Sequence, residues 1–223
     1  MDNNPLLFFF IYLFICYLIG SFPTSILVSY FLQKIDIREH GSHNAGATNV
    51  FRVLGWKPGI FVIVVDVFKG WLPTYFVADS FYNSFPENIF ELGLIKILFG
   101  FAAVLGHSYT IFANFQGGKG VGTLLGMLIA LFPIAIPLCM LIFLFSLIIT
   151  GYVSVGSILA SIFLPISLLT LPLMGVTPPS LSLIIFSLLI PFFVIFTHRA
   201  NISRLRAGNE NKFEKVMVFK KIF

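Results

Sequence analysis

Long apolar runs alternate with short polar segments along this chain of 223 residues. The runs at 6–32, 59–78 and 89–106 are each long enough for a membrane-spanning helix, which needs about 20 apolar residues. Between Lys119 and Arg199 lie 79 residues without a formal charge. Four spans of roughly 18 to 20 residues fill that stretch, with turns predicted at 133–137, 151–152 and 172–179, where Pro and Gly occur. The pattern therefore predicts about seven transmembrane helices.

Composition supports a membrane protein. Hydrophobic residues make up 58% of the chain and charged residues 10%, whereas a soluble domain carries about 25% charged residues. We therefore expect an all-α integral membrane protein with one domain over residues 1–223 and exclude a soluble enzyme. The segment 138–150 is short for a span, so a re-entrant or half-helix is the alternative there.

The basic residues predict the orientation in the membrane. Twelve of the 14 Lys and Arg residues lie in three polar segments, at 33–57, at 107–119 and from residue 198 onward, while 78–89 contains none. Positively charged loops face the cytoplasm, so we expect the N-terminus outside and the C-terminus and all three polar segments inside. The basic C-terminal tail favours anionic membrane lipids, and no motif for nucleic acid is found.

The first polar segment has the composition of a phosphate cradle. Glycines at 41 and 46 allow backbone N–H groups to turn inward, and short polar side chains surround them. A flexible polar loop is the alternative, and the two histidines His40 and His43 form a weak basis for a metal site. The expected phosphate-binding residues of this segment are Arg38, Ser42, Asn44, Thr48, Asn49 and Arg52.

The second polar segment ends in Gly117-Gly118-Lys119-Gly120 and leads directly into an apolar run. A lysine among glycines at the start of a helix combines an ammonium with free N–H groups, which favours an anion. The pattern lacks the spacing of a nucleotide-binding P-loop. His107 opens the segment and is added to the candidate phosphate site. A lysine that reaches toward lipid headgroups is the alternative for Lys119.

Several polar residues elsewhere are also candidates. The third polar segment contains His198 and Asn201, which share a face if the last helix continues through them. Ser154 follows the turn predicted at 151–152. Asp66 and Lys69 are three residues apart in an apolar run, a spacing that allows an ion pair.

Taken together, these segments resemble the bacterial acyl-phosphate:glycerol-3-phosphate acyltransferases, the PlsY family. One departure is His43, where the family more often has Gly after the serine of its glycine-rich loop. The matching stretches span nearly the whole chain: Gly20-Ser21-Phe22-Pro23, 36–52, 66–70, 106–122, Tyr152-Val153-Ser154 and 198–210.

The resemblance implies an enzyme of the bacterial cytoplasmic membrane, with its active site at the cytoplasmic face. It would move an acyl group from acyl phosphate to the sn-1 hydroxyl of glycerol 3-phosphate, giving lysophosphatidic acid and phosphate, without metal or cofactor. It also implies a site lined by Ser42, Thr48, Arg52, Lys119, Ser154, His198 and Asn201. His198 is the candidate base, and a substrate phosphate oxygen is the alternative proton acceptor. A transporter of a small phosphorylated solute is the alternative function.

Overall fold

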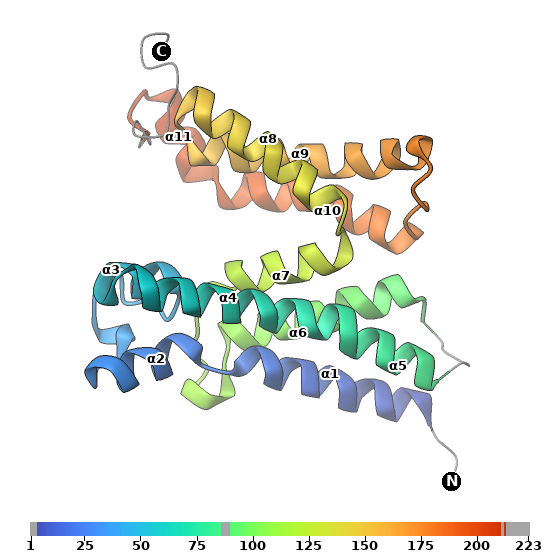
Figure 1. Ribbon diagram of the computed structural model, residues 1–223, viewed down its shortest axis with the longest axis horizontal. Helices are drawn as coiled ribbons and strands as arrows, with labels where there is room; N and C mark the ends of the chain where they lie inside the picture. The colour runs from blue at the N-terminus through green and yellow to red at the C-terminus, as the bar shows by residue number, and fades with distance from the viewer. Residues whose placement is uncertain (1–3, 86–89, 211, 213–223) are drawn as a thin grey trace. The chain divides into compact units, whose positions relative to one another are not determined.

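The computed structural model describes residues 4–85, 90–210 and 212, and all regular structure in these residues is helical (Figure 1). Residues 86–89 of the predicted external connection, and residues 211 and 213–223 of the basic tail, lie outside the described residues. The chain forms two compact units, of which the first ends at Leu131 and the second begins at Phe132. Whether they act as the one domain expected over 1–223 stays a prediction.

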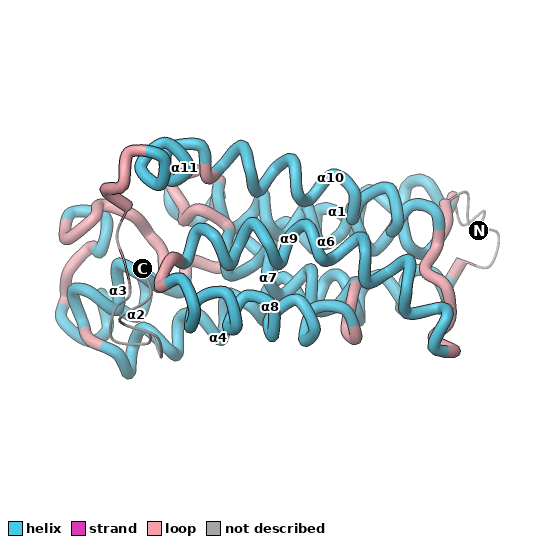
Figure 2. The backbone as a smooth tube through the Cα atoms, turned by 90° about the horizontal axis from the view of Figure 1, so that it is seen from above, coloured by secondary structure: helices cyan, strands magenta, loops and turns pink. Residues whose placement is uncertain are grey.

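In the first unit, the helices alternate with short 3-10 and π-helical segments. Their bounds are α1 Pro5–Ser21, α2 Thr24–Gln33, η1 Ile37–Glu39, α3 Ala47–Leu54, α4 Trp56–Leu72, η2 Pro73–Val77, α5 Ala78–Ser84, α6 Leu92–Ser108, η3 Ile111–Ala113 and α7 Val121–Leu131. In the second unit they are α8 Ala135–Thr150, α9 Val153–Thr170, η4 Leu171–Met174, α10 Leu181–Thr197 and α11 Arg199–Arg206. Figure 2 shows the loops that join these helices.

Glycines allow two pairs of helices in the first unit to pack with their backbones close together. On α1, a Cβ atom at Gly20 would overlap the carbonyl of Ala103 on α6, and one at Gly106 would overlap the carbonyl of Tyr17. The pair α4 and α7 is packed in the same way, because Gly126 lies against the Val67 carbonyl. Small residues at helix contacts are typical of membrane proteins, where close backbone packing drives association.

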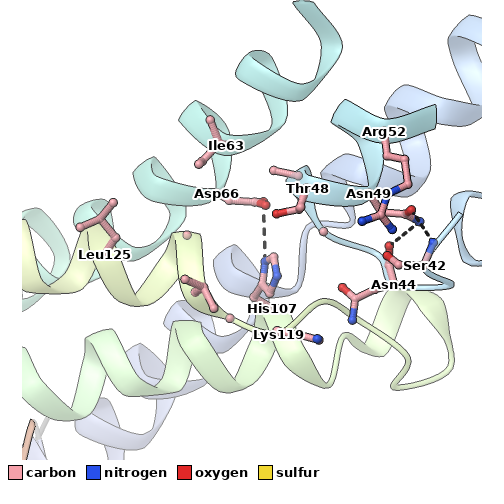
Figure 3. Close-up of a pocket in the computed structure, with 15 residues that line it drawn as sticks. Ser42, Asn44, Thr48, Asn49, Arg52, Ile63, Asp66, His107, Lys119 and Leu125 are labelled. Carbon is pink, nitrogen blue, oxygen red and sulfur yellow. Dashed lines mark hydrogen bonds and ion pairs between the residues drawn. The ribbon is translucent and has the colours of Figure 1, made fainter. Parts of the chain in front are cut away.

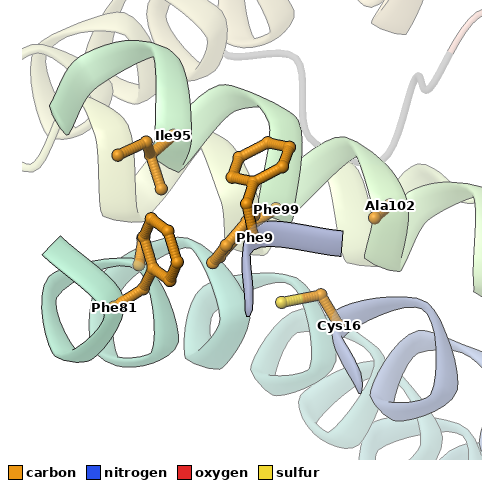
Figure 4. Packing of buried hydrophobic residues seen from close by; sticks show 7 residues of the cluster. Phe9, Cys16, Phe81, Ile95, Phe99 and Ala102 are labelled. Atoms are coloured by element: carbon orange, nitrogen blue, oxygen red, sulfur yellow. The ribbon is translucent and has the colours of Figure 1, made fainter. Parts of the chain in front are cut away.

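An aromatic cluster joins α1, α5 and α6 within the first unit (Figure 4). The ring centroids of Phe9 and Phe99 are 5.5 Å apart, and those of Phe81 and Phe99 are 5.7 Å apart. Such pairs contribute about 0.5 to 1.5 kcal/mol each beyond the area that they bury. Cys16 is fully buried in the same cluster. The cluster fixes α5 to its neighbours.

In the second unit, α9 packs against both α8 and α10. The turn between α8 and α9 contains Gly151 at a φ of 75°, a left-handed conformation that glycine adopts without strain. Gly156 on α9 lies against Phe143 of α8. The predicted turn at 151–152 is therefore confirmed, and it places Ser154 in the first turn of α9.

Four helical segments of the described residues are long and apolar enough to cross a membrane: Pro5–Gln33, Trp56–Ser84, Leu92–Ala113 and Val153–Met174. Three shorter apolar helices accompany them: Val121–Leu131, Ala135–Thr150 and Leu181–Thr197. The chain is thus an all-helical membrane protein, as expected. The number of seven spans and their orientation stay predictions.

Three expectations about the helices need correction. The connection predicted to begin at Ala78 is helical as far as Ser84, and Asp79 pairs with Lys96 of α6 at 2.9 Å. Apolar runs end where side chains become polar, but a helix can continue because its backbone hydrogen bonds are internal.

The spans expected after Lys119 are also unequal. The short helix is Val121–Leu131, with 11 residues, whereas the segment suspected at 138–150 belongs to a 16-residue helix.

The third correction concerns the first predicted span, which breaks between α1 and α2. Phe22 and Pro23 separate the two helices, because Pro lacks an N–H and restricts the residue before it. The hydrophobicity of the run continues across this point, so the hydropathy pattern alone predicts one helix. The break leaves backbone carbonyls at the end of α1 that need partners from elsewhere.

Candidate functional site

A cavity of about 340 Å³ opens in the first unit between the polar segments and the helices α4 and α7 (Figure 3). Its apolar lining comes from Ala47, Ile63, Val121 and Leu125. Its polar lining comes from Ser42, Asn44, Thr48, Asn49, Arg52, Asp66, His107 and Lys119. Seven of the eight phosphate-binding residues predicted from the sequence, all except Arg38, therefore line one pocket.

Asn49 organises the loop that forms one wall of the pocket. Its side chain is buried, and its Oδ1 accepts a hydrogen bond from the Ser42 backbone N–H at 2.8 Å. Its Nδ2 donates to the backbone carbonyls of Ile37, His40 and Asn44 at 2.9 to 3.1 Å. These bonds occupy the amide of Asn49 within the protein, so it shapes the loop around Ser42.

Thr48 and Arg52 come to the pocket from a helix. Sequence reasoning treated 33–57 as a loop with phosphate-binding groups, but Ala47–Leu54 forms α3. Residues four apart lie on one face of a helix, so Thr48 and Arg52 project together. The opposite face carries Val50, which is fully buried beside Ile37 and Val62. Thus a core contact fixes the direction of the two pocket residues.

His43 adopts a left-handed conformation, with a φ of 56°. Glycine adopts such a φ without steric cost, whereas a residue with a Cβ atom does not. Here the His43 ring compensates in part, since its Nδ1 lies 3.1 Å from the Arg38 carbonyl oxygen. The loop therefore has a left-handed conformation at His43, although a residue with a side chain disfavours this conformation.

The glycines around Lys119 dock on the end of α6. The Gly117 N–H donates to the Ser108 carbonyl and the Gly118 N–H donates to the His107 carbonyl, both at 3.1 Å. Gly120 has a φ of 74° and leads into α7. Lys119 is exposed and lines the pocket. The predicted arrangement of a lysine among glycines directly before an apolar helix is confirmed.

Arg38 is not part of the pocket lining. Its guanidinium binds the Asp36 carboxylate, with Nη2 at 2.6 Å from Oδ2, and Nη1 donates to the Ala113 carbonyl at 3.1 Å. The hydrogen bond from Arg38 holds the pKa of Asp36 below its ordinary value. Arg38 therefore joins two loops, and we do not include it among the proposed phosphate ligands.

Asp66 and Lys69 form the ion pair that their spacing allows, with Lys69 Nζ at 2.8 Å from Asp66 Oδ1. His107 Nδ1 lies 3.6 Å from the same carboxylate oxygen, as Figure 3 shows. Lys69 also donates to the carbonyl of Phe22 at 2.7 Å, and so satisfies an acceptor at the break between α1 and α2. Asp66, Lys69 and His107, here called the buried cluster, are at most 7% exposed.

Glu210, which sequence reasoning left without a role, binds two of the predicted residues of the second unit. Asn201 Nδ2 donates to its Oε1 at 2.7 Å, and Ser154 Oγ donates to the same oxygen at 3.1 Å. Arg204 Nε donates to Oε2 at 2.6 Å. These hydrogen bonds, that from Asn201 first, lower the pKa of Glu210. An acidic residue in a basic segment was the available sign of this role.

His198 lies at the junction of α10 and α11, where the last long helix ends at Thr197 and a short helix begins at Arg199. Its Nδ1 is 2.8 Å from the Val194 carbonyl oxygen. A carbonyl oxygen can only accept, so Nδ1 carries a proton, and in the neutral ring Nε2 then has the lone pair. The ring thus has the tautomer that a base needs.

Within the described part of the chain, no three His, Cys, Asp or Glu side chains gather as metal ligands.

Comparison with known proteins gives consistent matches. A family model described as glycerol-3-phosphate acyltransferase matches residues 10–208. Two proteins named glycerol-3-phosphate acyltransferase are similar over 223 and 219 residues: that of Chlorobium chlorochromatii (strain CaD3) is 40% identical, and that of Chlorobaculum tepidum 43% identical. These matches cover 90% and 89% of this chain, and 94% and 93% of the relatives.

Two crystal structures are also similar to the chain, each with 33% sequence identity. Both are of PlsY (YgiH), described as an integral membrane glycerol 3-phosphate acyltransferase. The glycerol 3-phosphate form matches with a TM-score of 0.66, over 96% of this chain and 99% of that one. The lysophosphatidic acid form matches with a TM-score of 0.65, over 92% and 94%.

Proposed function

This chain belongs to the glycerol-3-phosphate acyltransferase family, and from that membership we propose that its acyl donor is an acyl phosphate and its acceptor the sn-1 hydroxyl of glycerol 3-phosphate. The products are lysophosphatidic acid and inorganic phosphate. The structures of the similar protein in glycerol 3-phosphate and lysophosphatidic acid forms support the acceptor and the product.

The observation that carries the proposal is the composition of the pocket. Two cations, Arg52 and Lys119, share it with the hydroxyls of Ser42 and Thr48, and apolar side chains follow along α4 and α7. Charge-assisted hydrogen bonds from such groups hold a phosphate. We propose that Arg52 and Lys119 bind substrate phosphate, that Ser42, Asn44 and Thr48 complete its hydrogen bonds, and that Asn49 holds the loop around it.

An acyl phosphate suits a site of this kind because it is a mixed anhydride, whose phosphate leaves readily. The acceptor hydroxyl attacks the acyl carbon, the bond from that carbon to the phosphate oxygen breaks, and the hydroxyl proton passes to a base. Positioning of two phosphate-bearing substrates and neutralisation of their charges supply most of the acceleration. No covalent enzyme intermediate is then needed.

In the second unit, we propose that His198 takes or directs the proton through Nε2. Ser154 and Asn201 contribute to the same reaction, held in place by Glu210. The matched family model, over residues 10–208, includes Ser154, His198 and Asn201. The membership of an acyltransferase family favours an enzyme over the alternative of a transporter.

For the topology, we propose seven spans with the N-terminus outside and the reaction at the cytoplasmic face of a bacterial inner membrane. In support, the described residues contain four long and three shorter apolar helices. The concentration of Lys and Arg in the three polar segments supports their cytoplasmic location.

The test is to incubate the purified protein in detergent with labelled glycerol 3-phosphate and, in turn, an acyl phosphate, an acyl-CoA and an acylated carrier protein. We expect lysophosphatidic acid from the acyl phosphate, with the acyl chain at sn-1. Product from the thioesters in the absence of acyl phosphate would contradict the proposed donor. A product acylated at sn-2 would contradict the proposed position.

Lys119→Met provides the matched variant, because methionine keeps the aliphatic stem and removes the charge. Loss of a charge-assisted hydrogen bond should lower catalytic efficiency roughly ten- to a hundredfold. Lys119→Arg restores the charge with a different shape, so we expect partial recovery. Wild-type kinetics in Lys119→Met would show that the lysine contacts only lipid headgroups.

A further inference from the structure

The buried cluster of Asp66, Lys69 and His107 stands where four parts of the first unit meet. Asp66 and Lys69 come from α4 and His107 from the end of α6. Lys69 reaches the Phe22 carbonyl at the break between α1 and α2. The fourth part is the segment 117–122, which contains Lys119. Burying three ionisable groups together costs free energy unless each group is paired. Their presence at this junction therefore needs an explanation.

The glycines that flank Lys119 lie directly on the buried cluster. A Cβ atom at Gly118 would overlap Nε2 of His107, and one at Gly122 would lie 3.0 Å from the Cβ of Asp66. The Gly118 N–H donates to the His107 carbonyl at 3.1 Å. The segment is thus held on both sides of Lys119, by His107 before it and by Asp66 after it.

The two residues that hold the segment are themselves held. The Asp66 carboxylate lies within 2.8 Å of the Lys69 ammonium and 3.6 Å of the His107 ring, and Lys69 is tied to the backbone at Phe22. Both Asp66 and His107 also reach the wall of the pocket. A shift of either would therefore move the backbone that carries the Lys119 ammonium.

We propose that the buried cluster is a positioning device, which holds the segment 117–122 so that the Lys119 ammonium meets the substrate phosphate. Asp66 and Lys69 act through Lys119 and do not touch the phosphate themselves. The inference rests on the proposed phosphate-binding role of Lys119. It gives a function to the one ion pair that the sequence places inside an apolar run.

A double-mutant cycle tests the inference, with binding of glycerol 3-phosphate to the detergent-solubilised protein as the readout. Titration calorimetry needs no acyl donor, so the result does not depend on the donor's identity. The cycle compares wild type, Asp66→Asn, Lys119→Met and the double variant. We expect Asp66→Asn to weaken binding about tenfold alone and to have almost no further effect in the Lys119→Met background, because residues that act as a unit are not additive.

Two further variants guard against misfolding of Asp66→Asn. The variant with both Asp66→Asn and Lys69→Met removes the two charges together, so no buried charge is left unpaired. Gly122→Ala disturbs the contact with Asp66 from the other side without changing any charge. Each should show the same coupling to Lys119→Met. The matched control is Asp79→Asn, which removes the partner of Lys96 elsewhere in the unit and should leave binding unchanged.

The outcomes separate the inference from the proposal beneath it. If the cluster variants weaken binding by the same factor with and without Lys119, they act independently of it and the inference is wrong. Binding as tight as wild type in the cluster variants would overturn it equally. If instead Lys119→Met binds glycerol 3-phosphate as wild type does, the phosphate role of Lys119 fails, and the inference fails with it.

Discussion

The amide of Asn201 donates a hydrogen bond to Oε1 of Glu210 at 2.7 Å, and the same oxygen accepts from Ser154. One carboxylate thus connects the start of α9 with α11. Because Asn201 and Ser154 are both proposed to take part in the reaction, Glu210 determines where their side chains stand. Its own side chain is 6% exposed.

We expect the stability of the protein to depend on the ionisation of Glu210. Its pKa in the fold is below its ordinary value of 4.5, so its contribution is present above that value and is lost as the pH falls through the folded pKa. Thermal unfolding in detergent should therefore show a midpoint that falls on acidification below about pH 4.5. Glu210→Gln should lower the midpoint at pH 7 and weaken this acid dependence.

Both carboxylate oxygens of Glu210 accept hydrogen bonds. In Glu210→Gln one of them is replaced by an amide nitrogen, which cannot accept a hydrogen bond. Glu91→Gln changes an exposed carboxylate at the start of α6 and is the matched control. An acid profile in Glu210→Gln that is identical to that of wild type would disprove the role of this residue.

The sequence predicted those features that depend on neighbouring residues. Hydropathy located the apolar helices, and the spacing of Asp66 and Lys69 predicted their ion pair, because residues three apart meet on a helix. The glycines around Lys119 and the apolar run after them predicted a lysine at the start of a helix, which is α7. Each of these is a local property that a short window of sequence contains.

The features that sequence reasoning missed depend on which of several available partners a polar side chain contacts, and one of these partners is distant in the chain. Glu210 is 56 residues from Ser154, and no periodicity links them. The side chain of Asn49 is of a type that can bind phosphate, but its amide already donates hydrogen bonds to backbone carbonyls of the surrounding loop. Similarly, Arg38 has the charge for a phosphate, and Asp36 lies two residues away to pair with it. Composition alone does not distinguish these competing partners.

The tautomer of His198 leads to a kinetic prediction. If Nε2 accepts the proton of the acceptor hydroxyl, His198→Gln should lower kcat by roughly a hundredfold or more, because Gln remains polar but cannot act as a base. Steady-state assays with acyl phosphate and glycerol 3-phosphate measure this. A loss of only a few-fold in a folded variant would assign the proton to a substrate phosphate.

His43 gives a prediction about stability. A left-handed φ costs a residue with a Cβ about 1 to 2 kcal/mol relative to glycine, and β-branched residues tolerate it least. We therefore expect His43→Val to unfold at a lower temperature than wild type. His43→Gly should be more stable than His43→Val by about 1 to 2 kcal/mol. Equal unfolding midpoints for the Val and Gly variants would show that the turn at 43 is not maintained.

The proposed topology predicts opposite behaviour for two exposed positions. Asn83 lies on α5, at the proposed outer end, and Gln116 lies beside the Gly117 loop at the proposed inner end. In intact cells, Asn83→Cys should react with an impermeant thiol reagent and Gln116→Cys should be protected. Opening the membrane should make Gln116→Cys reactive, and the reverse pattern in intact cells would overturn the orientation.

The burial of Cys16 has a practical consequence for that experiment. Cys16 is 0% exposed within the aromatic cluster, and Cys139 is 5% exposed on α8. The chain contains only these two cysteines, and a water-soluble reagent must reach the sulfur before it can react. The unaltered protein therefore offers a low labelling background, so introduced thiols can be read directly without first replacing the native ones.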